Sequence, residues 1–239
     1  MKGAQVNSTR KTALVAGVFY LTSFISIPTL ALYGPLKTHR DFIISSGSNT
    51  AVLWGGFLEV IVALAGIGTA VTLFPVVRRQ NEGMALGFVA IRTLEAGMIY
   101  TGVVTLHSLV TLRQTGATGA DAASLVTTGK SLVATYNWTF LLGQSLSPAI
   151  SALLLGTLMY QSGLVPRVIP RMGLIGAPLL ITAIIATLFG LIKQTNPLAA
   201  LAALPVALWE LSLGVYLVVK GFKPSPITDE MVAAGTTPA

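Results

Sequence analysis

The sequence has no cysteine and few charged residues. Only 10% of its 239 residues are charged, whereas 53% are hydrophobic, and the mean hydropathy is +0.77. An ordinary soluble domain carries roughly 25% charged residues, so this chain has too few to cover a surface that faces water. The composition therefore indicates a membrane protein whose main partner is the lipid bilayer. The lack of cysteine also excludes disulfides, thiolate nucleophiles and Cys-ligated metal sites.

Several functional signatures are also missing. The chain has two histidines, too few for a His-rich metal centre, and it contains neither a His-Glu-x-x-His nor a Gly-x-Ser-x-Gly motif. We therefore expect no metal and no cofactor. The formal net charge is +7, but the basic residues stand singly or in pairs between apolar segments. This distribution argues against a nucleic-acid partner and indicates membrane topology instead.

Six apolar segments are long enough to cross a bilayer. A helix needs about 20 mostly apolar residues to span the hydrocarbon core. The sequence therefore predicts an all-α fold, a polytopic membrane protein built as a bundle of six transmembrane helices. The predicted spans are Ala13–Tyr33, Ala51–Val77, Met84–Val110, Leu132–Tyr160, Met172–Ile192 and Pro197–Val219.

The chain divides into a membrane domain and a tail. We interpret the first apolar segment as a helix because its apolar run exceeds the roughly 7–15 residues of a signal peptide. Residues 1–220 then form one transmembrane domain. From residue 221 onward Pro, Gly and Thr are frequent, which predicts a disordered cytoplasmic tail over residues 221–239.

Lys and Arg are distributed unequally between the two sides of the membrane. If both termini lie on one side, nine of the 15 Lys and Arg residues are on that side and five on the other, with Arg92 inside a span. Positive charges in the loops favour the cytoplasm. We therefore expect both termini to be cytoplasmic.

Four ionisable residues fall well inside the predicted spans: Glu59, Arg92, Glu95 and Glu210. A charge at the bilayer centre costs about 2.5–3.5 kcal/mol even on a lenient scale, so such residues face the bundle interior or a wet cavity. Their depths, at about 1.5 Å per residue, let all four converge on one buried site. Arg92 and Glu95 are three residues apart and can pair on one helix face. One arginine cannot neutralise three carboxylates, so Glu59 or Glu210 must take up a proton, a hydrogen bond, water or a cation.

The fourth predicted span carries a stripe of polar side chains. Asn137, Gln144 and Ser151 are spaced by seven residues and share one face of a regular helix. The stripe either lines a cavity or hydrogen-bonds to neighbouring helices. The candidate ligand-binding residues are therefore Glu59, Arg92, Glu95, Glu210, Asn137 and Gln144.

Three short motifs carry a family resemblance. They are Leu-Glu-Val-Ile at Leu58–Ile61, Arg-x-x-Glu at Arg92 and Glu95, and Trp-Glu-Leu-Ser-Leu-Gly-Val-Tyr-Leu at Trp209–Leu217. Through them the sequence resembles a bacterial family of six-helix membrane proteins described as domain of unknown function 4386 (DUF4386), over roughly residues 11–222. The resemblance implies a multi-pass protein of the bacterial inner membrane, and it implies no particular activity.

Three functions are compatible with these features. The first is binding or transport of a small polar or amphipathic molecule at the buried Glu and Arg residues. The second is an accessory or structural role, in which the same residues only fix helix packing. The third, which we favour least, is an intramembrane enzyme with a Glu as general acid or base, because no nucleophile or metal set accompanies the carboxylates. The sequence leaves open the identity of a ligand and whether the chain forms a homo-oligomer.

Overall fold

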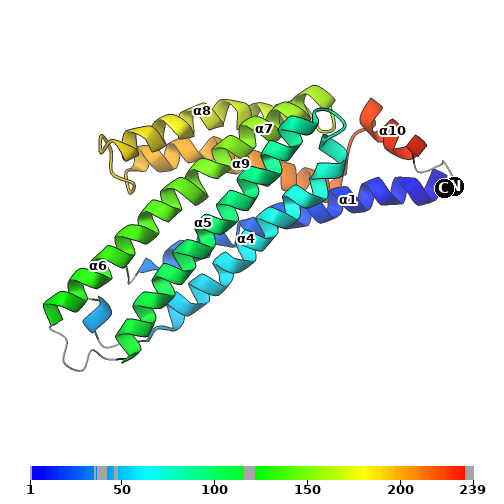
Figure 1. Ribbon diagram of the computed structural model, residues 1–239. Helices are drawn as coiled ribbons and strands as arrows, with labels where there is room; N and C mark the ends of the chain where they lie inside the picture. The colour runs from blue at the N-terminus through cyan, green and yellow to red at the C-terminus, as the bar shows by residue number, and fades with distance from the viewer. Residues whose placement is uncertain (1, 35, 37–41, 46–47, 116–121, 235–239) are drawn as a thin grey trace.

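The structure is a computed structural model that describes residues 2–34, 36, 42–45, 48–115 and 122–234. Throughout these residues the regular secondary structure is helical (Figure 1). Two short pieces are not α-helical: η1 is a 3₁₀ turn and η2 is a π-helix. The elements are α1 (Lys2–Ser23), α2 (Ser26–Leu32), η1 (Phe42–Ile44), α4 (Thr50–Val77), α5 (Glu82–Thr115), α6 (Ala122–Thr139), η2 (Phe140–Ser145), α7 (Leu146–Ser162), α8 (Val168–Leu188), α9 (Pro197–Val219) and α10 (Pro226–Ala234).

Six helical segments of the described chain are long and apolar enough to cross a membrane. They confirm the predicted fold class, an all-α polytopic protein with six spans. The fourth span is one continuous rod built from α6, η2 and α7. The six segments are Thr9–Thr29, Thr50–Val77, Glu82–Thr115, Ala122–Ser162, Val168–Leu188 and Pro197–Val219.

Local sequence explains where several spans begin and end. Gly163 follows α7 in the left-handed conformation with φ of 68°, which glycine adopts without steric cost. Asn196 precedes α9, and its side chain accepts a hydrogen bond from the backbone N–H of Leu198. Pro197 occupies the first helical position, where its missing N–H costs no helical hydrogen bond.

The six spans form a closed ring. The pairs in contact are α1 with α4, α4 with α5, α5 with α7, α7 with α8, α8 with α9, and α9 with α1. In Figure 1, α4, α5 and the α6–α7 rod run side by side, and α8 and α9 lie together at an angle to them. The first and last spans are therefore neighbours. Large apolar side chains such as Leu64, Val71 and Val104 are exposed on the outside, as expected for surfaces that face lipid.

Arg10 joins the first and last spans at one end of the ring. Its guanidinium donates hydrogen bonds to the backbone carbonyls of Leu217, Val218 and Val219. These are among the last carbonyls of α9, which have no partner within the helix. A cation at this end also interacts favourably with the helix dipole.

The segment after α9, for which the sequence predicts a disordered tail, contains the helix α10. α10 lies against α1 and α4, and Ile227 is buried in the main hydrophobic cluster. The backbone N–H of Lys223 also donates to the carbonyl of Leu164, 2.8 Å away. The prediction from composition overlooked Ile227, which supplies apolar surface that can be buried.

The close approach of α8 and α9 depends on glycine. A Cβ atom added at Gly176 would lie 2.7 Å from Cβ of Pro205 and 2.9 Å from the backbone N of Val206. Backbone atoms of α9 cannot move aside as a flexible side chain can. At Gly97, by contrast, an added Cβ meets nothing within 4 Å.

We predict that Gly176→Ala lowers the thermal stability of the detergent-solubilised protein. Overpacking of a tight helix contact typically costs about 1–3 kcal/mol. The matched control is Gly97→Ala, which we expect to leave the midpoint of unfolding unchanged or slightly raised because alanine favours helix. Thermal denaturation followed by size-exclusion chromatography measures both. Equal midpoints for the two variants would contradict this packing.

Candidate functional site

Three ionisable side chains are almost completely buried inside the spans. Glu59 on α4 is 0% exposed, Arg92 on α5 is 4% exposed and Glu95 on α5 is 8% exposed. The fourth candidate, Glu210 on α9, is slightly more accessible, with 13% of its side chain exposed. Because buried charges are stable only when they have partners, the contacts of these residues determine what the interior of the protein can do.

Glu59 is the centre of a hydrogen-bond network that we call the tyrosine network. The hydroxyl of Tyr33 donates to Oε2 of Glu59, and the hydroxyl of Tyr136 and Nε2 of Gln144 both donate to Oε1, each at 3.0 Å. A buried carboxyl group needs hydrogen-bond partners of this kind. The tyrosine network therefore ties the segment after α2 and the fourth span to α4.

Glycines make room for the rings of the tyrosine network. A Cβ at Gly55 would lie 2.5 Å from the ring of Tyr33, and a Cβ at Gly102 would lie 3.2 Å from the ring of Tyr136. The two rings also meet edge to face, with centroids 5.3 Å apart. Small residues on α4 and α5 thus bring both hydroxyls within reach of Glu59.

Arg92 is the centre of a second cluster, which we call the arginine network. Its Nη1 bonds to Oε2 of Glu95 at 2.9 Å, and its Nη2 bonds to Oε1 of Glu210. The guanidinium carbon also lies 5.5 Å from the ring centroid of Tyr20 and 5.8 Å from that of Phe88. Since these residues come from α1, α5 and α9, the arginine network reaches across the ring of spans.

The structure brings together three of the four ionisable residues that the sequence predicted to converge. Glu59 hydrogen-bonds to a different set of residues, and a single site that includes all four stays a prediction. Depth explains the difference, because Gly56 faces the ring of His107 on α5. Glu59 on α4 therefore lies beside the part of α5 near His107. At about 1.5 Å per residue, this level is on the order of 10 Å along the α5 axis from Glu95.

A cavity of about 640 Å³ lies between the fourth span, α8 and α9. Its volume is in the range of small-molecule pockets. Its wall contains Gln144, which bonds to Glu59, and Glu210, which bonds to Arg92, so the cavity adjoins both networks. The polar residues of its wall are Asn137, Gln144, Ser145, Thr187, Gln194, Thr195 and Glu210.

The fourth span supplies residues on both sides of the π-helix η2 to the wall of the cavity. Asn137 and Gln144 line it, as their spacing suggested, but Ser151 is not part of its wall. Leu141 and Pro148, which share this face of a regular helix, also line the cavity, so the face continues past η2. Ser151 is instead 1% exposed within the bundle. The stripe thus lines the cavity as far as Pro148, and Ser151 lies beyond the cavity wall.

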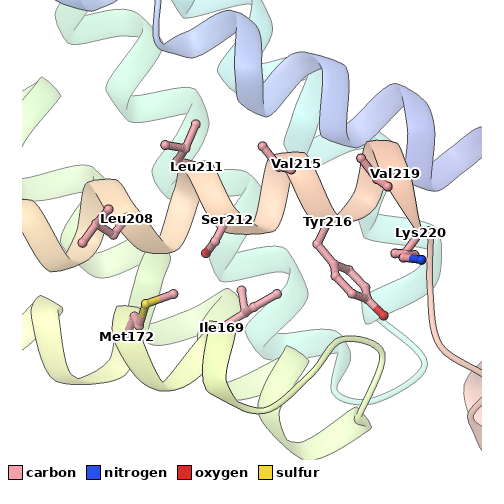
Figure 2. A pocket seen from close by; sticks show the side chains of 9 residues that line it. All are labelled: Ile169, Met172, Leu208, Leu211, Ser212, Val215, Tyr216, Val219 and Lys220. Carbon is pink, nitrogen blue, oxygen red and sulfur yellow. The ribbon is translucent and has the colours of Figure 1, made fainter.

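A second hollow, of about 460 Å³, lies on the outer surface of the bundle. Figure 2 shows it between α8, with Ile169 and Met172, and α9, with Leu211 and Val215. Lys220 lies at one end. None of the six predicted ligand-binding residues is among the residues that line this groove. Its apolar, exposed walls are typical of a surface that faces lipid chains.

Sequence reasoning missed the tyrosines that complete both networks. Tyr33 and Tyr136 bond to Glu59, and the ring of Tyr20 lies against Arg92. All three side chains are at most 1% exposed. Their positions inside apolar segments were a usable signal, because a buried tyrosine hydroxyl needs a polar partner. Sequence spacing could not predict the partner of each tyrosine, because the partners are on different helices.

The fold and these networks define an all-helical, multi-pass membrane protein with buried ionisable clusters in its interior. The chain belongs to the family described as Domain of unknown function (DUF4386), which matches residues 15–221. This match confirms the resemblance carried by the motifs around Glu59, Arg92 and Glu210. Comparisons with curated proteins and with solved structures found no match.

We predict that Arg92→Met strongly destabilises the protein. Without the guanidinium, the carboxylates of Glu95 and Glu210 remain buried beside one another, and removing one partner of a buried pair typically costs about 3–5 kcal/mol. Adding Glu95→Gln and Glu210→Gln to Arg92→Met should restore most of the loss. Thermal denaturation in detergent measures all variants. If Arg92→Met unfolds at the wild-type temperature, the arginine network does not support the bundle.

We predict a smaller effect when the tyrosine network loses one donor. Tyr136→Phe keeps the ring but removes the hydrogen bond to Glu59, and weakening a buried polar contact in this way costs about 1–3 kcal/mol. Tyr100→Phe is the control, because Tyr100 is 37% exposed. We expect a lower unfolding temperature for Tyr136→Phe alone, in the same thermal assay. A matching drop for Tyr100→Phe would mean that hydroxyl loss acts nonspecifically.

Proposed function

We propose that this protein binds a small polar or amphipathic molecule in the cavity between the fourth span, α8 and α9, and moves it across the membrane. One observation carries the proposal: three of the six residues singled out as ligand-binding, Asn137, Gln144 and Glu210, line one cavity. Ionisable residues inside a membrane domain mark substrate pathways more often than ordinary packing.

The shape of the cavity suits a pathway. Along α9 its wall runs from Ala199 to Glu210, which corresponds to roughly 16 Å at 1.5 Å per residue. Gln194 and Thr195, in the connection between α8 and α9, line its other end. The cavity thus extends from a carboxylate deep in the membrane domain to a connection at the end of two spans.

The helices around the cavity contain features that allow bending. The π-helix η2 supplies Phe140, Leu141, Gln144 and Ser145 to the wall, and π-helical turns are frequent at functional sites. Prolines interrupt the backbone hydrogen bonds of α8 at Pro178 and of α9 at Pro205. Transport requires such movable segments, whereas a purely structural bundle does not.

The excess of Lys and Arg on the side of the termini supports an orientation with both termini in the cytoplasm. The membrane in this proposal is the bacterial inner membrane, in keeping with the resemblance described above. The connection between α8 and α9 is then outside the cytoplasm. A ligand would enter the cavity from that side and reach Glu210 near the middle of the bilayer.

The accessory role is the main alternative, and Arg92 is the observation that favours it. Its two ion pairs could serve only to hold α5 and α9 together. The two functions differ in one respect, because only a binding protein needs the cavity to be empty of side chains.

Native mass spectrometry of the protein released gently from membranes tests the proposal. We predict a non-lipid adduct on the wild type that is lost in Ala203→Phe, because Ala203 lines the cavity and phenylalanine would fill it. The control is Ala134→Phe, at an exposed position on α6 outside the cavity. Both variants should remain folded by size-exclusion chromatography. Wild type and Ala203→Phe carrying identical adducts, or only ordinary lipids, would favour the accessory role.

A further inference from the structure

One arginine serves two carboxyl groups beside the cavity. Arg92 pairs with both Glu95 and Glu210, so one positive charge faces two carboxylates. In the part of the chain that the structure describes, no other Lys or Arg forms an ion pair with either Glu. A buried carboxylate without its own counter-charge is costly. One of the two carboxyl groups must therefore take up either a proton or an external cation.

A cation in the cavity can reach the arginine network through Glu210. Glu210 lines the cavity, whereas Glu95 and Arg92 do not. Arg92 bonds to Oε1 of Glu210, and among the described residues no other group donates a hydrogen bond to this carboxylate. Its second oxygen, Oε2, is then available to a group that enters the cavity.

The remaining wall favours an amphipathic cation. None of the described residues that line the cavity is Lys, Arg or His, so an anion would meet Glu210 without a compensating charge. Leu141, Ile184 and Val206 supply apolar surface, and the side-chain amides of Asn137 and Gln194 supply polar contacts. This mixture suits an organic body that carries one charged group.

A bare metal ion fits this wall less well. Among the described residues, no group of three or more His, Cys, Asp or Glu side chains is arranged to hold a metal. Hard cations such as Ca²⁺ need six to eight oxygen ligands, and the wall has a single carboxylate. A volume of about 640 Å³ is also far larger than an ion requires.

Building on the proposed function, we infer that the ligand of this cavity is a monovalent, amphipathic organic cation whose charge pairs with Glu210 and whose apolar body contacts Leu141, Ile184 and Val206. Arg92, which also pairs with Glu95, holds the Glu210 carboxylate in position on the side away from the cavity. An organic cation at Glu210 thus supplies the counter-charge that a proton would otherwise supply.

Equilibrium dialysis with two probe ions in neutral detergent tests the inference. Tetraphenylphosphonium and tetraphenylborate have nearly the same size and shape but opposite charges. We expect the wild type to bind the phosphonium and not the borate. Glu210→Gln should weaken phosphonium binding by about tenfold or more, because a charge-assisted contact is lost. The control, Glu82→Gln, alters an exposed carboxylate at the start of α5 and should bind as the wild type does.

A second variant keeps Glu210 and protects the test against misfolding of Glu210→Gln. Ala200 is exposed and lines the cavity in the first turn of α9, so Ala200→Lys adds a positive charge near the cavity without touching the arginine network. We expect it to weaken phosphonium binding and to permit borate binding. Absence of phosphonium binding by the wild type, or equal binding of both ions, would overturn the inference.

The cavity-filling variant separates this inference from the proposed function. If Ala203→Phe abolishes binding of both ions while Glu210→Gln and Ala200→Lys change neither, the cavity is a binding site but does not select cations. If Ala203→Phe leaves the binding of both ions unchanged, the cavity is not the site and the proposed function fails as well.

Discussion

The ion pairs of Arg92 set the constraint on which the interior of this protein depends. A guanidinium that faces lipid chains is costly. In the middle of a helix bundle it therefore pairs with side chains of its own and neighbouring helices. Arg92 finds one carboxylate a turn away on α5 and the other across the ring on α9. The aromatic ring of Tyr20, from α1, covers the same cation. The position of α9, which forms one wall of the cavity, is thereby coupled to the helices on the opposite side of the ring.

The tyrosine network performs a comparable task for the other half of the bundle, with hydrogen bonds in place of an ion pair. Glu59 accepts hydrogen bonds from two separate segments of the chain, the end of α2 and the fourth span, and one of the donors, Gln144, also lines the cavity. Each of the two networks therefore contributes one side chain to the same cavity. A ligand that changed the contacts of Gln144 or Glu210 would alter the helix packing on both sides, which is a physical basis for linking binding to movement.

The fold could be predicted from the sequence because hydropathy and length alone decide which segments span a bilayer. The pairing of Arg92 with Glu95 was also predictable, because it depends on helical spacing within one span. The partners of Glu59 were not, because Tyr33 and Tyr136 come from segments whose relative depth only the packed bundle fixes. Ser151 lies outside the cavity wall although it was predicted on the same helix face as Gln144, because spacing along one helix does not show where a cavity ends. Sequence periodicity thus predicted contacts within one helix, and it could not predict contacts between spans or the extent of the cavity.

The contact of Arg10 with the end of α9 has a consequence for how the protein is made. The ring of spans closes only when α9 packs between α8 and α1. Of the six spans, α9 is the last to leave the ribosome. Until residue 219 has been synthesised, the guanidinium of Arg10 lacks the carbonyls of Leu217, Val218 and Val219, and one flank of α1 is covered by lipid alone. Of the six spans, the first to be inserted is therefore among the last to reach its final neighbours. Assembly of this bundle joins spans that are far apart in the sequence, and the interior polar groups that bond to α9 remain unpaired until α9 has been inserted.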